Sequence, residues 1–284
     1  MHAIPKNPDL HCHSTVSDGW LSPTDVVQRA ARNGVDFLAL TDHDETGGLV
    51  EAQAAATESG IRLVPGVEVS VSWGGETIHV VGLGVDADNP VLQAGLIQLR
   101  AGRHTRAQQM SDALAALGIR GVLDGALTFA RNPALVSRAH FARHLVAIGL
   151  MPNVDAVFKH YLVRGKPGFV ETKWADLADA VQWIRAAGGV PVVAHPGRYR
   201  LSDIEMERLL ARFVDAGGQG IEVVSGSHSD AKVSKFARYA RRFDLLASRA
   251  SDFHGEQESR VDLGRCAPLP DGVVPVWSRL IDRF

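Results

Sequence analysis

Apolar and polar residues recur along this chain with two different periods, and these periods predict its secondary structure. Short apolar runs such as VDFLAL and VPVVA are rich in β-branched residues, which is typical of buried strands in a parallel sheet. Stretches with helical spacing lie between such runs. The clearest begins with Ser22 and Pro23 and ends at Gly34, so it carries an N-cap, a proline at the first helical position and a terminator. Strands that alternate with helices predict a mainly parallel sheet or barrel.

The pattern changes after Asp86. From residue 89 to residue 165, periodic Leu, Ala and Met predict helices, and no strand alternation is convincing. Helix breaks are expected at Gly118, Asn132-Pro133 and Met151-Pro152. We therefore expect one barrel-like α/β domain, residues 1–86 and 168–284, with a mainly helical insertion at residues 87–167.

The sequence predicts a turn in one further stretch and no regular structure in another. Gly74-Gly75 separates two strand-like runs and predicts a hairpin. Residues 256–284 have no regular pattern, and the sequence does not place them.

Composition narrows the cellular context. Hydrophobic residues make up 45% of the 284 residues, which is enough for a large core. The two cysteines, Cys12 and Cys266, form no disulfide framework, so a reducing compartment is expected. The N-terminus has no secretory pattern, and no apolar run approaches the roughly 18 residues of a membrane span. These features predict a soluble cytoplasmic protein without membrane partners.

The charge is unevenly distributed although the net charge is only −2. Residues 98–166 hold ten Lys or Arg and three acids, a local charge of +7, so the remainder carries −9. A solvated helical surface would explain this segment. The alternative is an anionic substrate held between the two parts. Double-stranded nucleic acid is not an expected partner, because the total charge is negative and aromatic residues make up only 6%.

Metal-binding side chains gather at the predicted strand ends. In DLHCHS, strand alternation places His11 and His13 on one face and turns Cys12 toward the core. Similar residues recur at or near later strand ends; they are Asp42, His43, Asp44, Glu68, His79, His195, Asp252 and His254. The carboxyl ends of parallel strands are where α/β folds gather their active sites. Burying so many polar groups without partners would cost several kcal/mol per charge, and bound cations would remove that cost.

Four motifs, DLHCHS, TDHD, AHPGR and SDFHG, resemble those of the PHP (polymerase and histidinol phosphatase) family. The resemblance covers residues 8–86 and 168–256. It implies a distorted (β/α)7 barrel with an inserted, mainly helical cap, and a site for two to three divalent metal ions. Carried over by motif, one ion would be held by His11, His13, Glu68 and Asp252, a second by Glu68, His79 and His195, and a third by Asp18, His43 and His254. Several family members have a histidine in place of Asp18.

Mixed imidazole and carboxylate ligands suit Mn²⁺, Fe²⁺, Co²⁺ or Zn²⁺, and the resemblance favours Mn²⁺. The nucleophile would then be a hydroxide that bridges the metal ions, with no side-chain nucleophile. Asp42 is expected to lie behind the ligands and to orient an imidazole through its other ring nitrogen, and Asp9 is a similar candidate.

The basic insertion is expected to select the substrate, because arginine forms paired hydrogen bonds with phosphate. The leading candidates are Arg138 in SRAHFARHL and Ser137 beside it, at a predicted helix start. The further candidates are Lys166, Lys173, Arg198, Arg200, Arg103 and Arg106. For Arg103 and Arg106, the solvated face of a long helix is an equally good interpretation.

The insertion and SRAHFARHL resemble one branch of the family, the 3′,5′-nucleoside bisphosphate phosphatases. The first hypothesis is therefore removal of the 3′-phosphate from a nucleoside 3′,5′-bisphosphate, such as 3′-phosphoadenosine 5′-phosphate, to give the 5′-monophosphate. The second is 5′-to-3′ exoribonuclease action on short RNA. Histidinol-phosphate phosphatase is a third, but its cationic substrate fits a +7 segment less well. A non-enzymatic metal-binding module for a partner protein is the fourth.

Overall fold

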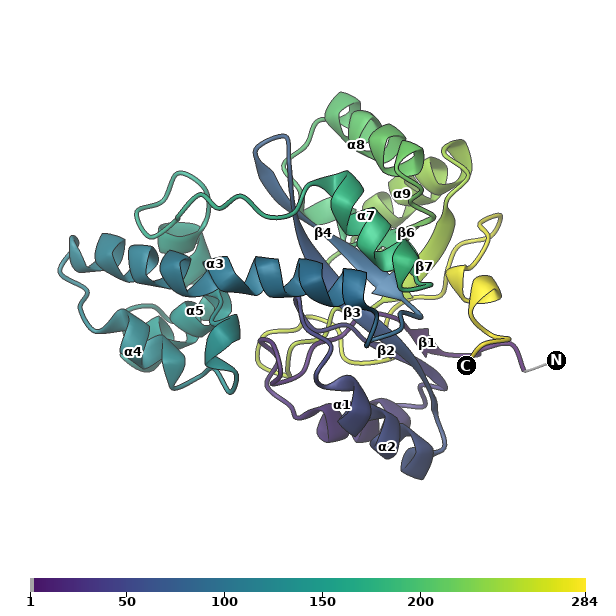
Figure 1. Ribbon diagram of the computed structural model, residues 1–284, viewed down its shortest axis with the longest axis horizontal. Coiled ribbons are helices and arrows are strands. Elements are labelled where there is room, and N and C mark those ends of the chain that lie inside the picture. The colour runs from purple at the N-terminus through teal and green to yellow at the C-terminus, as the bar shows by residue number, and fades with distance from the viewer. Residues whose placement is uncertain (1–2) are drawn as a thin grey trace.

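The computed structural model describes residues 3–284 and contains one seven-stranded sheet in the order β1 to β7 (Figure 1). The strands are β1 (Pro8–Asp9), β2 (Phe37–Leu40), β3 (Arg62–Trp73), β4 (Glu76–Leu83), β5 (Val190–Val193), β6 (Gly220–Ser225) and β7 (Leu246–Ala250). The backbone N–H of Leu10 donates to the carbonyl of Arg249 over 3.1 Å, so the first and last strands meet. The expected barrel-like α/β fold is confirmed.

One strand distorts the barrel. β4 runs antiparallel to both β3 and β5, whereas the other neighbouring strands are parallel. The β3–β4 connection is the expected hairpin, and Gly74 and Gly75 adopt φ values of 56° and 78° there. A two-residue turn with positive φ at both positions matches the twist of the strands it joins. The remaining connections bring the carboxyl ends of β1, β2, β5, β6 and β7 to one end of the barrel.

Helices pack around the outside of the barrel (Figure 1). They are α1 (Pro23–Arg32), α2 (Leu49–Ser59), α7 (Leu177–Ala186), α8 (Asp203–Asp215) and α9 (Asp230–Arg242). In α1 the Ser22 side chain accepts a hydrogen bond from the backbone of Asp25, and Gly34 has φ 79° just past the helix, as its sequence predicts. α1 and α2 lie together on one side of the barrel, and α8 and α9 on the other.

β1 is shorter than the strand that the alternation in DLHCHS predicts through His13. Its ladder with β2 ends at Asp9, and Cys12 forms only an isolated bridge with Phe253. The chain nevertheless stays extended, because His13 N–H donates to the Phe253 carbonyl and the Cys12 carbonyl accepts from Thr41 N–H. The predicted alternation therefore holds, and the Cys12 thiol packs in the core, where it donates to the Ala39 carbonyl over 3.2 Å.

The inserted segment, which we call the cap, projects from one side of the barrel (Figure 1). It contains α3 (Pro90–Ala115), α4 (Val122–Leu127), α5 (Arg138–Ala147), α6 (Val154–Val157) and a π-helical turn (Phe158–Leu162). α3 contributes to two hydrophobic cores: Leu92 and Leu96 pack in the barrel core, whereas Met110 and Leu114 pack in the cap core. The boundary between the two cores therefore lies part-way along α3 and not at residue 87, where the insertion was expected to begin. None of the helices in residues 3–284 is long and apolar enough to cross a membrane.

The C-terminal segment, which the sequence left unplaced, seals the barrel interior. It contains a short 3-10 helix (Val276–Arg279), and the side chains of Val276 and Leu280 pack against Phe37, Leu83 and Val192. The segment is held by the backbone of Ala247, whose N–H donates to the Val274 carbonyl over 2.7 Å.

Candidate metal centre and substrate cleft

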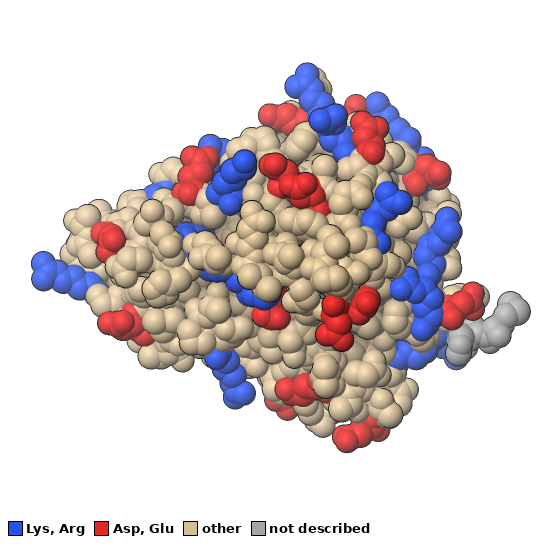
Figure 2. Space-filling model, in the orientation of Figure 1, with Lys and Arg blue, Asp and Glu red and all other residues tan. Residues whose placement is uncertain are grey.

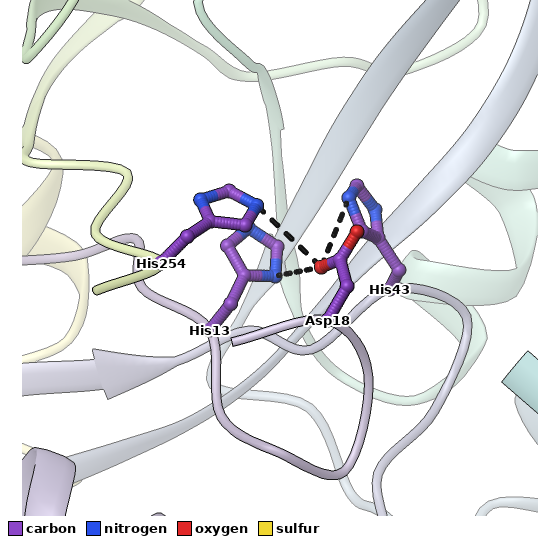
Figure 3. A group of neighbouring side chains, drawn as sticks. All are labelled: His13, Asp18, His43 and His254. Carbon is purple, nitrogen blue, oxygen red and sulfur yellow. Dashed lines mark ion pairs between the residues drawn. The ribbon is translucent and has the colours of Figure 1, made fainter. Parts of the chain in front are cut away.

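All nine side chains suggested as metal ligands meet at one end of the barrel, where β1, β2, β5, β6 and β7 have their carboxyl ends. Figure 3 shows three of the histidines around the carboxylate of Asp18: Asp18 Oδ1 lies 3.5 Å from His254 Nε2, 3.8 Å from His43 Nε2 and 3.9 Å from His13 Nδ1. These residues come from the segments that follow β1, β2 and β7. Side chains more than 200 residues apart in the sequence therefore share one site.

Glu68, on β3, is the centre of the other ligands. Its carboxylate is fully buried, and the imidazoles of five histidines lie within 3.4 Å of its oxygens. Oε1 faces His11 (3.3 Å), His79 (3.0 Å) and His195 (2.9 Å), and Oε2 faces His13 (3.4 Å) and His43 (2.8 Å). A carboxylate with both oxygens surrounded in this way is placed to serve more than one ion.

Four overlapping groups have the geometry to hold an ion. They are His13, Asp18, His43 and His254; His11, Glu68 and His195; His11, His13 and Asp252; and His43, Glu68 and His79. The grouping differs from the one that the resemblance implied. His13 joins the Asp18 group, Glu68 is absent from the group of His11, His13 and Asp252, and His79 and His195 face Glu68 in separate groups, His79 together with His43.

The donor set fits divalent cations. Asp18 Oδ1, His43 Nδ1, Glu68 Oε2 and Asp252 Oδ1 are buried and have no hydrogen-bond partner in residues 3–284. Leaving such atoms unpaired costs about 1–3 kcal/mol each, and more when they are charged. Oxygen and nitrogen donors that converge without protein partners are what a bound metal ion requires.

The pKa directions agree with a ligand role for Glu68 and His13, whereas Glu68 and Asp18 outweigh burial and raise the pKa of His43 to about 9. Burial would raise the pKa of Glu68, but the surrounding histidines outweigh it and hold the pKa well below its usual value. Burial, together with the neighbouring His254 and His43, lowers the pKa of His13 to about 3. Glu68 is thus anionic and His13 is neutral, which are the forms that bind metals.

Three residues of this site have strained backbones. Asp44, His195 and Asp252 adopt φ values of 50°, 26° and 54°. Non-glycine residues in such conformations cost about 1–3 kcal/mol each and persist only where the surroundings enforce them. Backbone strain is therefore concentrated where side chains must be aimed at one point.

Glu222, on β6, is a site residue that the sequence reasoning missed. Its Oε1 lies 2.6 Å from His11 Nδ1, and its Oε2 accepts the backbone N–H of His195 over 2.6 Å. It thereby orients one candidate ligand and fixes the backbone of another. The available signal was a single acid in the apolar run GIEVVS, the same signal that identified Glu68.

Asp42 and Asp9 do not orient an imidazole directly as expected. Asp42 accepts hydrogen bonds from Ser14 N–H (2.8 Å) and from the Ser17 hydroxyl (2.5 Å), and it approaches His13 only through Ser17, whose Oγ lies 3.4 Å from Nδ1. Asp9 accepts the backbone N–H groups of Ser251 and Gly264. Both carboxylates are occupied by loop backbone, so they shape the loops that carry the ligands.

A cleft of about 560 Å³ opens beside the metal-binding side chains. Five of the eight suggested substrate-binding residues line it: Arg103, Arg106, Ser137, Arg138 and Arg198. The other three do not. Lys166 and Arg200 are exposed outside the cleft, and Lys173 lines a separate surface hollow because its neighbour Trp174 takes the position that faces the cleft.

Arg103 and Arg106 are buried, which excludes a solvated helix face for them, whereas Arg138 is half-buried and Arg198 is exposed. Arg103 pairs with Asp44, and the guanidinium groups of Arg103 and Arg106 lie about 5 Å from the centre of the Trp174 ring. Arg106 Nε has no hydrogen-bond partner within the described chain. Burial, with Arg138 and Arg103 nearby, lowers the pKa of Arg106 well below its usual value. Arg106 and Arg138 form no ion pair with residues 3–284, so an anion would stabilise these two cations.

The surface of the cap does not concentrate this charge. Figure 2 shows basic and acidic side chains scattered over the cap at the left of the view, without a continuous basic patch on that face. Arg103, Arg106 and Arg143 are buried instead. Part of the +7 of the segment therefore points inward, toward the barrel.

Arg143, on α5, fastens the cap to the metal centre. Its Nε donates to Glu258 over 2.7 Å, a second nitrogen donates to the Asp18 carbonyl, and the guanidinium lies 4.5 Å from the centre of the Trp20 ring. The Ser137 hydroxyl, at the start of the same helix, donates to Asp18 Oδ2 over 3.1 Å. The first turn of α5 is thus held directly against a candidate metal ligand.

Comparisons with known proteins extend over this whole arrangement. The PHP domain family matches residues 9–189. The chain is 53% identical over 278 residues to a 3′,5′-nucleoside bisphosphate phosphatase of Chromobacterium violaceum, covering 98% of each chain. It is 44% identical over 274 residues to a 5′-3′ exoribonuclease of Haemophilus influenzae, covering 96% of this chain and 99% of that one.

Solved structures are also similar. A Chromobacterium violaceum structure, described as an amidohydrolase with bound sulfate and no metal, matches with a TM-score of 0.95 at 53% identity and covers 98% of this chain and 96% of that one. A Bifidobacterium adolescentis structure assigned as a metal-dependent phosphoesterase matches with a TM-score of 0.80 at 27% identity and covers 95% and 92%. The likeness therefore includes the cap as well as the barrel.

Proposed function

The chain belongs to the PHP domain family and is a metal-dependent phosphoesterase, and from this premise we propose that it removes the 3′-phosphate of nucleoside 3′,5′-bisphosphates to give the 5′-monophosphate. One observation carries the proposal. A single cleft contains, side by side, a set of unpaired metal-binding atoms and a group of arginines, of which Arg106 and Arg138 form no ion pair with residues 3–284. A substrate with two phosphates satisfies both sets.

The candidate ligands supply the reacting half of the site. When bound, divalent ions, for which we propose Mn²⁺ over Fe²⁺, Co²⁺ or Zn²⁺, would activate a water nucleophile and neutralise charge on the phosphoryl oxygens. Glu68 would serve two ions, while Glu222 orients His11 from behind. Arg198, whose NH2 lies 2.5 Å from Asp252 Oδ2, is placed to contact the reacting phosphate.

The cap supplies the selecting half. Arg103, Arg106 and Arg138 surround the cap end of the cleft, and Ser137 presents the first turn of α5 to it. We assign the 5′-phosphate to this end. Binding a remote phosphate here would position the 3′-phosphate at the metal centre, so that binding energy from a group that does not react assists the one that does.

A phosphate-release screen of Mn²⁺-reconstituted protein tests the proposal. Adenosine 3′,5′-bisphosphate should be hydrolysed with the highest kcat/KM, ahead of 3′-AMP, 5′-AMP and histidinol phosphate, and 5′-AMP should be its product. An equal kcat/KM on 3′-AMP would contradict the proposed role of the cap in binding the 5′-phosphate. Preference for histidinol phosphate would replace the proposed substrate, and no hydrolysis of any compound would favour a metal-binding partner module.

A further inference from the structure

The cap end of the cleft is lined by more than arginines. Val154, Asp155 and Phe158 also line it, and they come from one short stretch of the cap, α6 and the π-helical turn that follows it. Asp155 lies three residues before Phe158 and Val154 lies four before it, so both are neighbours of Phe158 on the helical surface. We call these three residues the α6 wall.

The backbone of this stretch widens at Phe158. The N–H of Val163 donates to the Phe158 carbonyl over 3.2 Å, five residues back along the chain, where an α-helix would have a spacing of four. Such π-helical turns are rare and occur frequently at functional sites. Phe158 itself is half-buried, packs against the cap core and lines the cleft. The widened turn therefore presents an aromatic side chain to the cleft.

Arg138 joins the α6 wall to the arginines of the cleft. Its guanidinium lies 5.7 Å from the centre of the Phe158 ring, and its NH1 donates over 3.4 Å to the carbonyl of Leu162, at the end of the π-helical turn. The arginine to which we assign the 5′-phosphate thus rests on the α6 wall. A nucleotide whose 5′-phosphate lies at Arg138 carries its base one ribose away, within reach of this wall.

Asp155 stands apart from the other acids that line the cleft. Asp18 and Asp252 belong to the candidate metal-binding groups, and Glu258 is bound by Arg143. Asp155 is exposed, and its side chain forms no hydrogen bond or ion pair with residues 3–284. A carboxylate repels a phosphate that enters the same cleft. Its contribution to binding would therefore be to accept a hydrogen bond from an N–H or O–H group of the ligand.

Trp174, a second aromatic residue in the described lining, is less accessible than Phe158. It is only 6% exposed, and the guanidinium groups of Arg103 and Arg106 lie 5.0 and 5.1 Å from the centre of its ring. The Trp174 ring therefore supports two arginines, whereas Phe158 leaves aromatic surface for a ligand.

We propose that the α6 wall binds the nucleobase of the substrate, with the base packed on Phe158 and Val154 and an exocyclic amino group donating to Asp155. The inference rests on the proposed function, in which Arg138 and its neighbours hold the 5′-phosphate. Aromatic rings bind bases by stacking, whichever base is present, because every base has a π face. The carboxylate adds selection, because it accepts from an amino group and repels a carbonyl oxygen at the same position. The α6 wall therefore predicts a preference for adenine over a base without an amino group.

Three bisphosphates separate the base from the phosphates. Adenosine 3′,5′-bisphosphate carries the base and its amino group, purine riboside 3′,5′-bisphosphate lacks only the amino group, and 1,4-anhydroribitol 3,5-bisphosphate has a hydrogen in place of the base. Phosphate release is measured with Mn²⁺-reconstituted protein. For the wild type we expect kcat/KM to fall about fivefold without the amino group and about 10²-fold without the base.

Asp155→Ala tests the contact with the amino group. It should lower kcat/KM about fivefold on adenosine 3′,5′-bisphosphate and have little effect on the purine riboside compound, which offers no amino donor. Asp124→Ala is the matched control, because Asp124 is likewise an exposed acid in the first turn of a short cap helix, α4, but lies outside the cleft. The control should leave kcat/KM on all three compounds unchanged.

Phe158→Leu tests the stacking contact, because leucine keeps an apolar side chain in the cap core but has no flat ring. This variant should lower kcat/KM about tenfold on the two compounds that carry a base and have little effect on the base-free compound. Thermal unfolding of the variant checks that the cap remains folded.

Binding to metal-free protein gives a readout without catalysis. 5′-AMP and ribose 5-phosphate share the 5′-phosphate and differ in the base, and both are titrated by calorimetry. The wild type should bind 5′-AMP about 10²-fold more tightly than ribose 5-phosphate, and Phe158→Leu should reduce this difference about tenfold. The affinity for ribose 5-phosphate should stay that of the wild type.

The outcomes distinguish the base subsite from the proposed function. A wild-type protein that hydrolyses the three bisphosphates with equal kcat/KM and binds 5′-AMP and ribose 5-phosphate equally overturns the base subsite alone. An equal fold-loss on all three compounds in Phe158→Leu also overturns it, because Phe158 would then act through Arg138 or the fold. An equal loss on the adenosine and purine riboside compounds in Asp155→Ala overturns the contact with the amino group and assigns Asp155 to a ribose hydroxyl. Failure of the wild type on every bisphosphate, with a retained preference for 5′-AMP in binding, overturns the proposed function and keeps the subsite.

Discussion

The two ends of the cleft consist of different kinds of side chain. At the metal centre, imidazoles and carboxylates are packed against one another at one end of the barrel, with unpaired atoms such as Asp252 Oδ1 and strained backbones at Asp44, His195 and Asp252. In the cap, guanidinium groups rest on the Trp174 and Phe158 rings and carry charge that few acids offset. The barrel therefore fixes where the reaction occurs, and the cap can change which molecule is brought there without moving the reacting groups.

The largest expected effect lies in the barrel. Glu68→Gln should lower bound metal and reduce kcat/KM on adenosine 3′,5′-bisphosphate by about 10³-fold or more, because it removes a charged ligand that both carboxylate oxygens are placed to provide. Metal content by mass spectrometry and phosphate release measure the two effects. Glu58→Gln, at an exposed position on α2, is the control. A variant with full metal content and unaltered turnover would show that the assignment of Glu68 is wrong.

A substitution in the cap should instead affect binding of the 5′-phosphate and leave the reaction at the 3′-phosphate nearly unchanged. Arg138→Ala should reduce kcat/KM on adenosine 3′,5′-bisphosphate by about 10²-fold and have little effect on 3′-AMP, since that substrate offers the arginine no 5′-phosphate. Metal content should remain that of the wild type. Each protein is measured on both substrates, with the exposed cap variant Arg120→Ala as control. An equal loss on both substrates would assign Arg138 to the reacting phosphate or to the fold.

The predictability of the two regions differs for a physical reason. Strand alternation dictates which side chains share a face, so His11 and His13 could be placed together and Cys12 apart from the sequence alone. Glu222 carried the same signal as Glu68, a lone acid in an apolar strand, and was missed because nothing in the sequence indicates its partner on β1. The hairpin, the helical insertion and a barrel-like α/β fold were predictable from residue patterns, whereas the seven-fold barrel was implied by the family resemblance.

The spacing of apolar residues in a helix does not predict which polar positions another element of the fold will bury. Arg103 and Arg106 could not be told from solvated residues, because Trp174, which packs against them, lies about 70 residues away in the sequence. Lys166, Lys173 and Arg200 were chosen by charge and proximity in the sequence, and the structure places all three outside the cleft. Loop and cap residues depend on long-range packing that local patterns do not record.

An intermediate effect is expected where the two regions join. Arg143→Lys keeps the charge but loses the paired contact with Glu258, because lysine has no planar fork. The start of α5 should then be held less firmly against Asp18, and KM for adenosine 3′,5′-bisphosphate should rise about tenfold while kcat on saturating substrate falls less. Metal content and the KM for 3′-AMP should change little. A fall in kcat with unchanged KM would contradict a positioning role for Arg143.

The smallest effect should come from Cys12, the neighbour of two candidate ligands in the sequence. Its thiol is buried in the barrel core, donates to the Ala39 carbonyl, and belongs to none of the groups that could hold an ion. Burial, with Asp9, Asp42 and Asp252 nearby, raises the pKa of the thiol well above its usual value, so it stays protonated and is a poor metal ligand. Cys12→Ala should therefore keep the full metal content and lower the free energy of unfolding by roughly 1 kcal/mol or less, as measured by urea denaturation.

Cys12→Ser is the control, because serine is close in size to cysteine but places a hydroxyl in an apolar core. If packing is the only role of the residue, this variant should lower the free energy of unfolding more than the alanine variant does. Selective loss of metal in the alanine variant would mean that the side chain reaches the ligands, and the alternation that separates residue 12 from residues 11 and 13 would then be wrong.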